Sequence, residues 1–171
     1  MGDLSFDHKA AQSILREELE VARQLIIDHI RANGQNASGR TIASLHVETD
    51  EGGGVLYGHR PFGVLETGRK AGKTPRSFRA IIYQWMMDKG IHATPIPYLT
   101  NRSHKYTEQM RADLSMASAI AHTIKTQGSS LYRKGGRNDV YSNVIPQTIE
   151  RIRSRMISLV HQDIKTITIN Q

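Results

Sequence analysis

The sequence predicts an α+β protein in which a long N-terminal helix and three further helices pack with a small antiparallel sheet. Apolar residues recur at helical spacing over most of the chain, which predicts the helices. A short alternating segment, three glycines and a second apolar segment predict a β-hairpin over about residues 45–58. At 171 residues the chain can bury a real core, and we expect a single domain over 1–171.

The first predicted element is a helix over about residues 7–33. Ala22 and Ile30 belong to its apolar stripe, Asp7 is a candidate N-cap, and Asn33-Gly34 is a typical helix end. Such a helix is roughly 38 Å long at 1.5 Å per residue, longer than a domain of this size needs. Two interpretations stay open at this point: part of the helix packs on a neighbouring subunit, or all of it belongs to the chain's own core.

The second predicted helix follows Thr74, a candidate cap, with Pro75 at its first position, and it ends at Lys89-Gly90. Its apolar face is expected to bury Trp85, the single tryptophan. A third helix is predicted to end before Gly128.

The last predicted helix starts at Pro146. Its inner stripe is expected to comprise Ile149, Ile152, Met156, Leu159 or Val160, and Ile164. After it, Ile167 and Ile169 alternate with threonines, a strand-like pattern that is compatible with a further strand at the edge of the sheet.

Extended loops are predicted over about residues 68–76, 91–106 and 129–144, and two of them are basic. The basic positions that we single out for contact with a partner or with DNA are Arg69, Lys70, Lys73, Arg76, Arg79, Arg133, Lys134 and Arg137. An ordinary solvated loop is the plainer interpretation of such a charge run. Glycines and charges give the segments 69–76 and 129–144 little reason to fold alone, so we expect both to be mobile in an isolated subunit.

Charge is divided unevenly along the chain, whose net charge is +7. Residues 1–58 hold 5 Lys and Arg against 9 Asp and Glu, whereas residues 59–171 hold 18 against 7. A chain with an acidic and a basic part is suited to binding DNA or to packing head to tail with its own copies, and the sequence does not separate the two.

No pattern in the sequence predicts catalysis or a cofactor. The eight histidines are dispersed, the chain has no cysteine, and the acidic residues after residue 58 are scattered. Neither a metal-ligand signature nor the clustered carboxylates of a two-metal nuclease is visible. We therefore expect a protein that is not an enzyme, without cofactor or metal and without a membrane segment.

Three short motifs resemble the tail-completion or tail-component family of tailed bacteriophages. The first is Ser38–Ser44, which precedes the hairpin. The second and third follow the hairpin and contain the motif positions Phe62, Leu65, Glu66, Thr67 and Gly68, and then Pro75 and Phe78. The resemblance covers about residues 38–90, and Gly68-Arg69 stands where the family usually has Gly-Thr.

The resemblance implies a structural subunit of the phage neck that forms a ring between portal and tail, with no catalytic residues. Its partners would be further copies of itself and the portal, adaptor or tail proteins, with DNA passing through the lumen. Its location would be the neck or tail region of the virion, after assembly in the cytoplasm of the bacterial host. A lumen must let DNA slide, so we expect the basic loops to contact acidic surfaces of neighbouring proteins. The alternative is a non-enzymatic DNA-binding protein that uses residues 69–79 and 133–137.

Overall fold

The computed structural model describes residues 8–99 and 105–169, with the side chains of 166–169 left aside. The chain forms two compact units. Unit 1 comprises Met1–Gln35, Thr41–Phe62 and Asn138–Gln171, and unit 2 comprises Asn36–Arg40 and Gly63–Arg137. Each unit is built from more than one segment, so the units do not follow one another along the chain as two separate domains would. The single domain over 1–171 stays a prediction.

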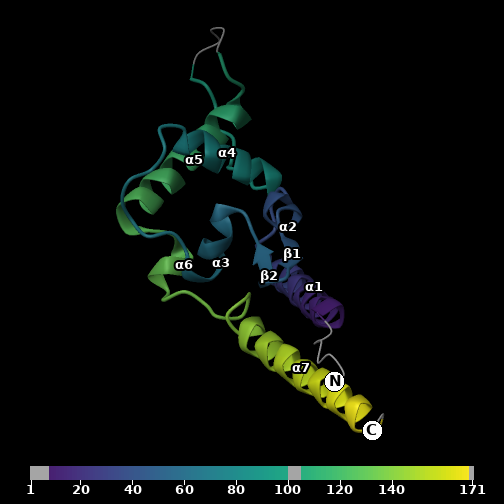
Figure 1. Cartoon of the computed structure of the whole chain (residues 1–171). Helices are drawn as coiled ribbons and strands as arrows, with labels where there is room; N and C mark the ends of the chain where they lie inside the picture. The colour runs from purple at the N-terminus through teal and green to yellow at the C-terminus, as the bar shows by residue number, and fades with distance from the viewer. Residues whose placement is uncertain (1–7, 100–104, 170–171) are drawn as a thin grey trace. The chain divides into compact units, whose positions relative to one another are not determined.

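Unit 1 is built from two long helices and the hairpin (Figure 1). Its elements are α1 (His8–Ala32), β1 (His46–Asp50), β2 (Gly53–Tyr57) and α7 (Val144–Ile169). The strands pair antiparallel from His46 opposite Tyr57 to Asp50 opposite Gly53. The Asp50 Oδ1 atom accepts a hydrogen bond of 2.8 Å from the Gly52 amide, which closes the turn.

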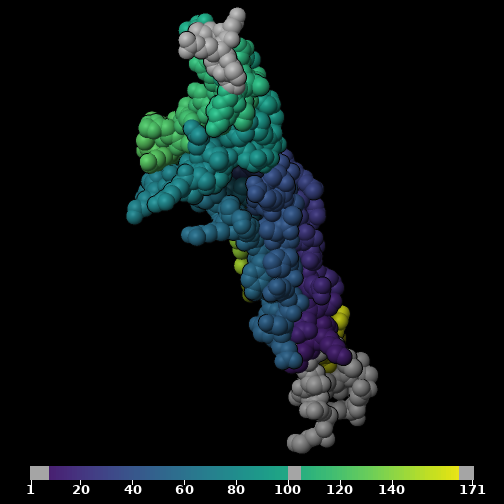
Figure 2. All heavy atoms as spheres, turned by 90° about the horizontal axis from the view of Figure 1, so that it is seen from above, coloured from purple at the N-terminus to yellow at the C-terminus, as the bar shows by residue number. Residues whose placement is uncertain are grey.

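The hairpin lies directly on α1, as Figure 2 shows for the blue and purple atoms. A Cβ atom on Gly54 would stand 2.5 Å from Leu19 Cδ1, so the glycine lets β2 lie close to this side chain of α1. Ile26, Ile30 and Leu45 are at most 4% exposed and form the core beneath the hairpin. This packing places the open faces of α1, β2 and α7 around one apolar space, described below.

Unit 2 is a pair of helices with short helical turns on either side. Its main helices are α4 (Phe78–Asp88) and α5 (Glu108–Gln127), and the short ones are α3 (Val64–Thr67) and α6 (Ser130–Arg133). Ile82 and Met86 of α4 pack on Ala117 and Ala121 of α5 and form the buried core of this pair. The alanines allow close approach of the two helices. Two further short elements, α2 (Arg40–Ala43) and the 3₁₀ helix η1 (Arg60–Gly63), lie where the chain passes between the units.

The predicted fold class, the long first helix and the hairpin are confirmed. Helix α1 ends at Ala32, and Gly34 follows with φ 62°, as a glycine at a helix end commonly does. The candidate cap Asp7 lies outside the described residues. The third predicted helix is confirmed as α5, which Thr107 caps by accepting a hydrogen bond from the Met110 amide and which ends before Gly128.

The predicted C-terminal strand is wrong, because α7 continues through Ile167 to Ile169. β-branched residues cost a helix little once it is nucleated, so an alternating Thr-Ile pattern does not end it. The helix also begins at Val144, two residues before Pro146. A proline is tolerated there because the first amides of a helix have no partner within it.

The predicted start of the second helix at Pro75 is also wrong, since α4 begins at Phe78. The Phe78 amide donates to the Pro75 carbonyl at 3.0 Å, so a turn precedes the helix. Trp85 is not core: it is 39% exposed, and Ile81 is 48% exposed. The single helix α5 covers only a narrow stripe of α4, and that stripe is Ile82 and Met86.

Candidate interaction sites

The two basic loops of unit 2 are hydrogen-bonded to each other. The Arg69 amide donates to Ser129 Oγ at 2.9 Å, and the Ser129 amide donates back to the Arg69 carbonyl at 2.8 Å. The Arg137 amide donates to the Glu66 carbonyl at 2.9 Å, and the Gly72 amide donates to the Lys125 carbonyl at the same distance. These hydrogen bonds order both loops, which their composition alone did not predict.

Glycines permit this close crossing of the loops. Gly68 has φ 69°, and a Cβ atom there would lie 2.4 Å from the Tyr132 nitrogen. Gly136 has φ 82°, and its Cβ would lie 2.8 Å from the Glu66 carbonyl oxygen. Positive φ values favour glycine independently of the space around it. The motif around Glu66 and Gly68 thus has a structural role, namely to hold the second basic loop against the first.

The predicted basic contact residues differ in how far their side chains are exposed. Six of the predicted contact residues are exposed: Lys70, Lys73, Arg76, Arg79, Arg133 and Lys134. Arg69 and Arg137 are half-buried. The Arg69 guanidinium lies 5.0 Å from the centre of the Phe78 ring and donates to the Lys73 carbonyl at 3.0 Å, so it stabilises its own loop. The six exposed side chains form the basic surface of unit 2.

The other motif positions serve packing in separate places. Phe62 belongs to unit 1, where its ring lies 5.0 Å from that of Tyr141. Leu65 is half-buried, Glu66 is 3% exposed and Thr67 bonds to the Gly63 carbonyl. Pro75 accepts the turn bond that precedes α4. None of these positions is itself basic, and Glu66 contributes to the loop contacts through its carbonyl oxygen.

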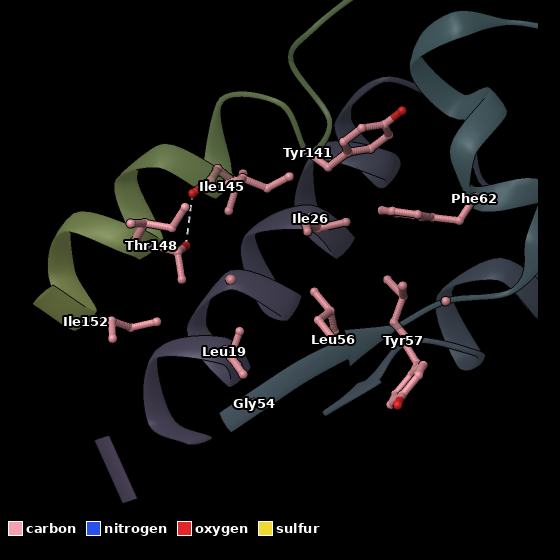
Figure 3. Close-up of a pocket in the computed structure, with 15 residues that line it drawn as sticks. Leu19, Ile26, Gly54, Leu56, Tyr57, Phe62, Tyr141, Ile145, Thr148 and Ile152 are labelled. Carbon is pink, nitrogen blue, oxygen red and sulfur yellow. Dashed lines mark hydrogen bonds between the residues drawn. The ribbon is translucent and has the colours of Figure 1, made fainter. Parts of the chain in front are cut away.

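A second candidate site, which the sequence did not predict, is an apolar groove in unit 1 with a cavity volume of about 320 Å³. Its lining includes Leu19 and Ile26 of α1, Leu56 of β2, and Ile145 and Ile152 of α7, which point toward a common space (Figure 3). Phe62 and Tyr141 stand at one end of it (Figure 3). The volume falls within the range of small ligand pockets and is large enough for one or two apolar side chains.

Helix α7 presents more apolar surface than unit 1 covers. Of the predicted inner stripe, Ile149 is 60% exposed, Val160 40% and Ile164 53%, and Ile145 and Ile157 beside it are 51% and 48% exposed. Within residues 144–165 of α7 the buried positions are instead Val144 and Thr148. The sequence did hold one signal of the groove. The last helix carries more isoleucines than a single antiparallel helix packed on it can bury.

Ion pairs join α1 and α7 in addition to their apolar contacts. Glu18 is 7% exposed and accepts hydrogen bonds from Arg151 at 2.7 Å and from Arg155 at 3.0 Å. Arg155 also bonds to Glu17 at 2.7 Å. The hydrogen bond from Arg151, and after it the one from Arg155, holds the pKa of Glu18 below its ordinary value despite burial. These charges fix α7 on α1, while Ile149, Ile157 and Ile164 of α7 stay exposed.

In unit 2 a buried carboxylate fixes the start of the extended segment after α4. Asp113 is 2% exposed, accepts from the Ala93 amide at 2.7 Å and lies 3.1 Å from His92 Nδ1. The Ala93 amide, and after it His92, lowers the pKa of Asp113. Gln109 bridges the Ala93 carbonyl and Asp113. This network is a structural clamp, since each oxygen of the carboxylate is engaged by the chain itself.

Within residues 8–99 and 105–169, no three His, Asp or Glu side chains are grouped so that they could hold a metal ion. Among the helices described there, none combines the length and apolarity that crossing a membrane requires. What the arrangement offers chemically is surface: a basic face on unit 2, and an apolar groove with an isoleucine ridge on unit 1.

Comparison with protein-family models finds no match, and neither curated proteins nor solved structures match the chain. The resemblance to phage tail-completion proteins therefore rests on the short motifs themselves.

Proposed function

We propose that the chain is a structural subunit of a bacteriophage neck, which joins the portal or head to the tail as a ring-forming head-tail connector or tail-completion protein. The observation that carries the assembly part of this proposal is the uncovered stripe of α7. Five aliphatic side chains on one helix, each 40–60% exposed, form a ridge of the kind that marks protein interfaces: Ile145, Ile149, Ile157, Val160 and Ile164.

Charge supports association between copies of this chain. Unit 1 holds 9 Lys and Arg against 12 Asp and Glu, a net charge of −3, and unit 2 holds 14 against 4, a net charge of +10. Two of the four acids of unit 2, Glu66 and Asp113, are buried, so its surface is more basic still. Opposite charge on two different units favours contacts in which unit 2 of one copy meets unit 1 of the next. The phage neck as the setting comes from the resemblance around Phe62–Gly68.

The proposal is tested on the purified full-length chain and on virions. Electron microscopy of the concentrated protein is expected to show closed rings, and mass spectrometry of purified particles is expected to detect the chain. A chain that stays monomeric at all concentrations and is absent from virions contradicts the proposal.

The second candidate function, DNA binding by a non-enzymatic protein, is favoured by the six exposed cations of unit 2. It is separated from the first by reversing two of them, Lys70→Glu and Lys73→Glu, neither of which is buried. On the neck proposal the variant loses assembly, while weak DNA binding by the free subunit changes little. If the basic surface instead grips DNA, the variant assembles normally, and the slope of log K against log salt falls by about 0.9 for each lost phosphate contact.

A further inference from the structure

The groove of unit 1 is an apolar receptor without an occupant among the described residues. Its walls come from α1, from β2 and from α7, and Ile145 and Ile149, at its α7 side, are 51% and 60% exposed. Thr148 and two tyrosines contribute the hydroxyls of the lining, and the Thr148 hydroxyl already donates to the Val144 carbonyl at 2.9 Å. Such a site favours aliphatic side chains over a polar ligand.

Unit 2 carries a segment with matching chemistry, the arm, which we define as residues 94–99 after α4. Its sequence is Thr-Pro-Ile-Pro-Tyr-Leu, and it forms neither helix nor strand. Leu99 is 100% exposed and Ile96 is 37% exposed. The prolines at 95 and 97 favour the polyproline conformation, in which residues three apart, such as Ile96 and Leu99, point to the same side. Two aliphatic side chains about 9 Å apart, at roughly 3.1 Å per residue, suit an elongated groove.

The arm is anchored so that these two side chains are left outside. The Tyr98 amide donates to Glu108 Oε1 at 3.1 Å, and the Tyr98 hydroxyl donates to the Tyr106 carbonyl at 2.9 Å. The Arg111 guanidinium lies 4.9 Å from the centre of the Tyr98 ring. Before the arm, Ala93 is held by Asp113. An anchor before the arm and another at Tyr98 within it, together with the prolines, reduce the conformational entropy that the arm loses on docking.

Charge favours a second copy of this chain as the partner. The arm is accompanied by Lys105 and Arg111, whose charged groups lie over Tyr106 and Tyr98. The hairpin that forms one wall of the groove carries the exposed acids Glu48, Asp50 and Glu51. The units that hold the arm and the groove have net charges of +10 and −3. Glu48 and Asp50 alternate with the residues paired to Leu56 and Gly54, so they lie on the outer face of the hairpin and not at the groove itself. The attraction between copies is therefore one between whole units of opposite net charge.

We propose that the arm of one copy docks in the groove of the next, with Leu99 and Ile96 buried against Leu56, Ile145 and Ile149. The donor surface and the acceptor surface are different, so the contact is heterologous and closes into a ring when the rotation between copies allows it. This inference deepens the proposed function and rests on it, because a chain that does not assemble has no neighbour to receive the arm.

The test uses the absence of cysteine from the chain. Leu99→Cys is made in one copy and Ile149→Cys in a second copy that carries a larger affinity tag, and the two are mixed and oxidised. The expected result is a mixed disulfide dimer well above the background of like pairs that each variant forms alone. The double variant is expected to give a ladder of linked oligomers on non-reducing gels. Val21→Cys replaces Ile149→Cys as the matched control, since Val21 is 47% exposed and does not line the groove.

A second measurement does not depend on disulfide geometry. Leu99→Ser is expected to weaken assembly by roughly ten- to a hundredfold, the effect of withdrawing one buried leucine, whereas Val21→Ser leaves assembly unchanged.

Each contrary result has its own meaning. Rings that form without the 99–149 disulfide and tolerate Leu99→Ser overturn the arm contact but leave the proposed function standing. A disulfide formed within one copy of the double variant shows that the arm docks on its own chain, which also overturns the inference. Wild-type protein that does not assemble, together with cysteine variants that do not cross-link, overturns the inference and the proposed function together.

Discussion

Glu18 is the buried charge that connects α1 to α7. Exchanging its carboxylate for an amide in Glu18→Gln removes the charge that Arg151 and Arg155 neutralise. We expect a loss of about 1–3 kcal/mol in the free energy of unfolding, because charge-assisted hydrogen bonds to a largely buried group are lost. Urea denaturation of the two proteins at neutral pH measures the difference.

The same residue predicts a pH dependence. The folded pKa of Glu18 lies below the ordinary value of an unfolded glutamate, and that of Glu17 is also lowered, chiefly by its hydrogen bond with Arg155. Their stabilisation is therefore complete above about pH 5 and is lost as the pH falls through the folded pKa values. Thermal melting of the wild type should decline more steeply below pH 5 than that of Glu18→Gln. Parallel pH profiles would show that the lowered pKa of Glu18 contributes nothing to stability.

Gly68 is a second position at which one residue decides local structure. Gly68→Ala places a Cβ 2.4 Å from the Tyr132 nitrogen in a backbone of φ 69°. We expect a cost of at least about 1–3 kcal/mol in stability, the typical penalty of a left-handed non-glycine residue. Gly63→Ala is the control, since a Cβ there meets no atom within 4 Å and its φ is −59°. Equal melting temperatures for the two variants would contradict the role given to Gly68.

Individual residues also show where sequence reasoning ends. Glu66 and Gly68 were recognised as a motif, but their contacts come from the loop around residues 129–137, more than sixty residues later. Trp85 was expected in the core because it belongs to the apolar stripe of its helix. The partner helix α5 buries only Ile82 and Met86 of that stripe. The spacing of apolar residues in α4 cannot show how many of them the partner helix will cover.

The two basic loops are elements whose order is open to direct measurement. Mobility in the isolated subunit was expected from their composition. The hydrogen bonds of the Gly72, Ser129 and Arg137 amides instead predict slowed exchange of these three protons in the free chain. Hydrogen exchange resolved by residue provides the test, with the exposed turn amide of Glu51 as a fast reference. Exchange as fast at all three as at Glu51 would restore the original expectation.

In helix α7 the predicted inner stripe is largely exposed, and this difference leads to a prediction. Its apolar stripe was predicted to face inward. In the structure, Arg151 and Arg155 pair with Glu18 of α1, and Val144 and Thr148 are the buried positions among residues 144–165. The double variant Ile157→Ser with Ile164→Ser should therefore change the stability of the free subunit by only about 0.5 kcal/mol. Its assembly should be weakened at the same time.

Denaturation followed by circular dichroism measures the stability of the free subunit, and sedimentation measures its assembly. A large loss of subunit stability without any change in sedimentation would mean that the stripe is core after all.

At the scale of the whole molecule, the sequence predicted the fold class, the long helix, the hairpin and the uneven charge. It did not predict that the segments 1–35, 41–62 and 138–171 combine into one unit, or that the groove forms there, because both depend on contacts between parts far apart in the chain. The excess of basic residues lies in unit 2, and the excess of acidic residues lies in unit 1. A unit of net charge −3 and a unit of +10 are suited to contact between neighbouring copies.

The measurement that tests the central claim most directly is the native mass of the purified full-length chain over a range of concentrations at physiological ionic strength. Assembly through two different surfaces predicts a single closed oligomer of fixed copy number, in equilibrium with the 19.2 kDa subunit and without an open-ended series of larger species. A protein that remains at the mass of one subunit throughout would contradict the account.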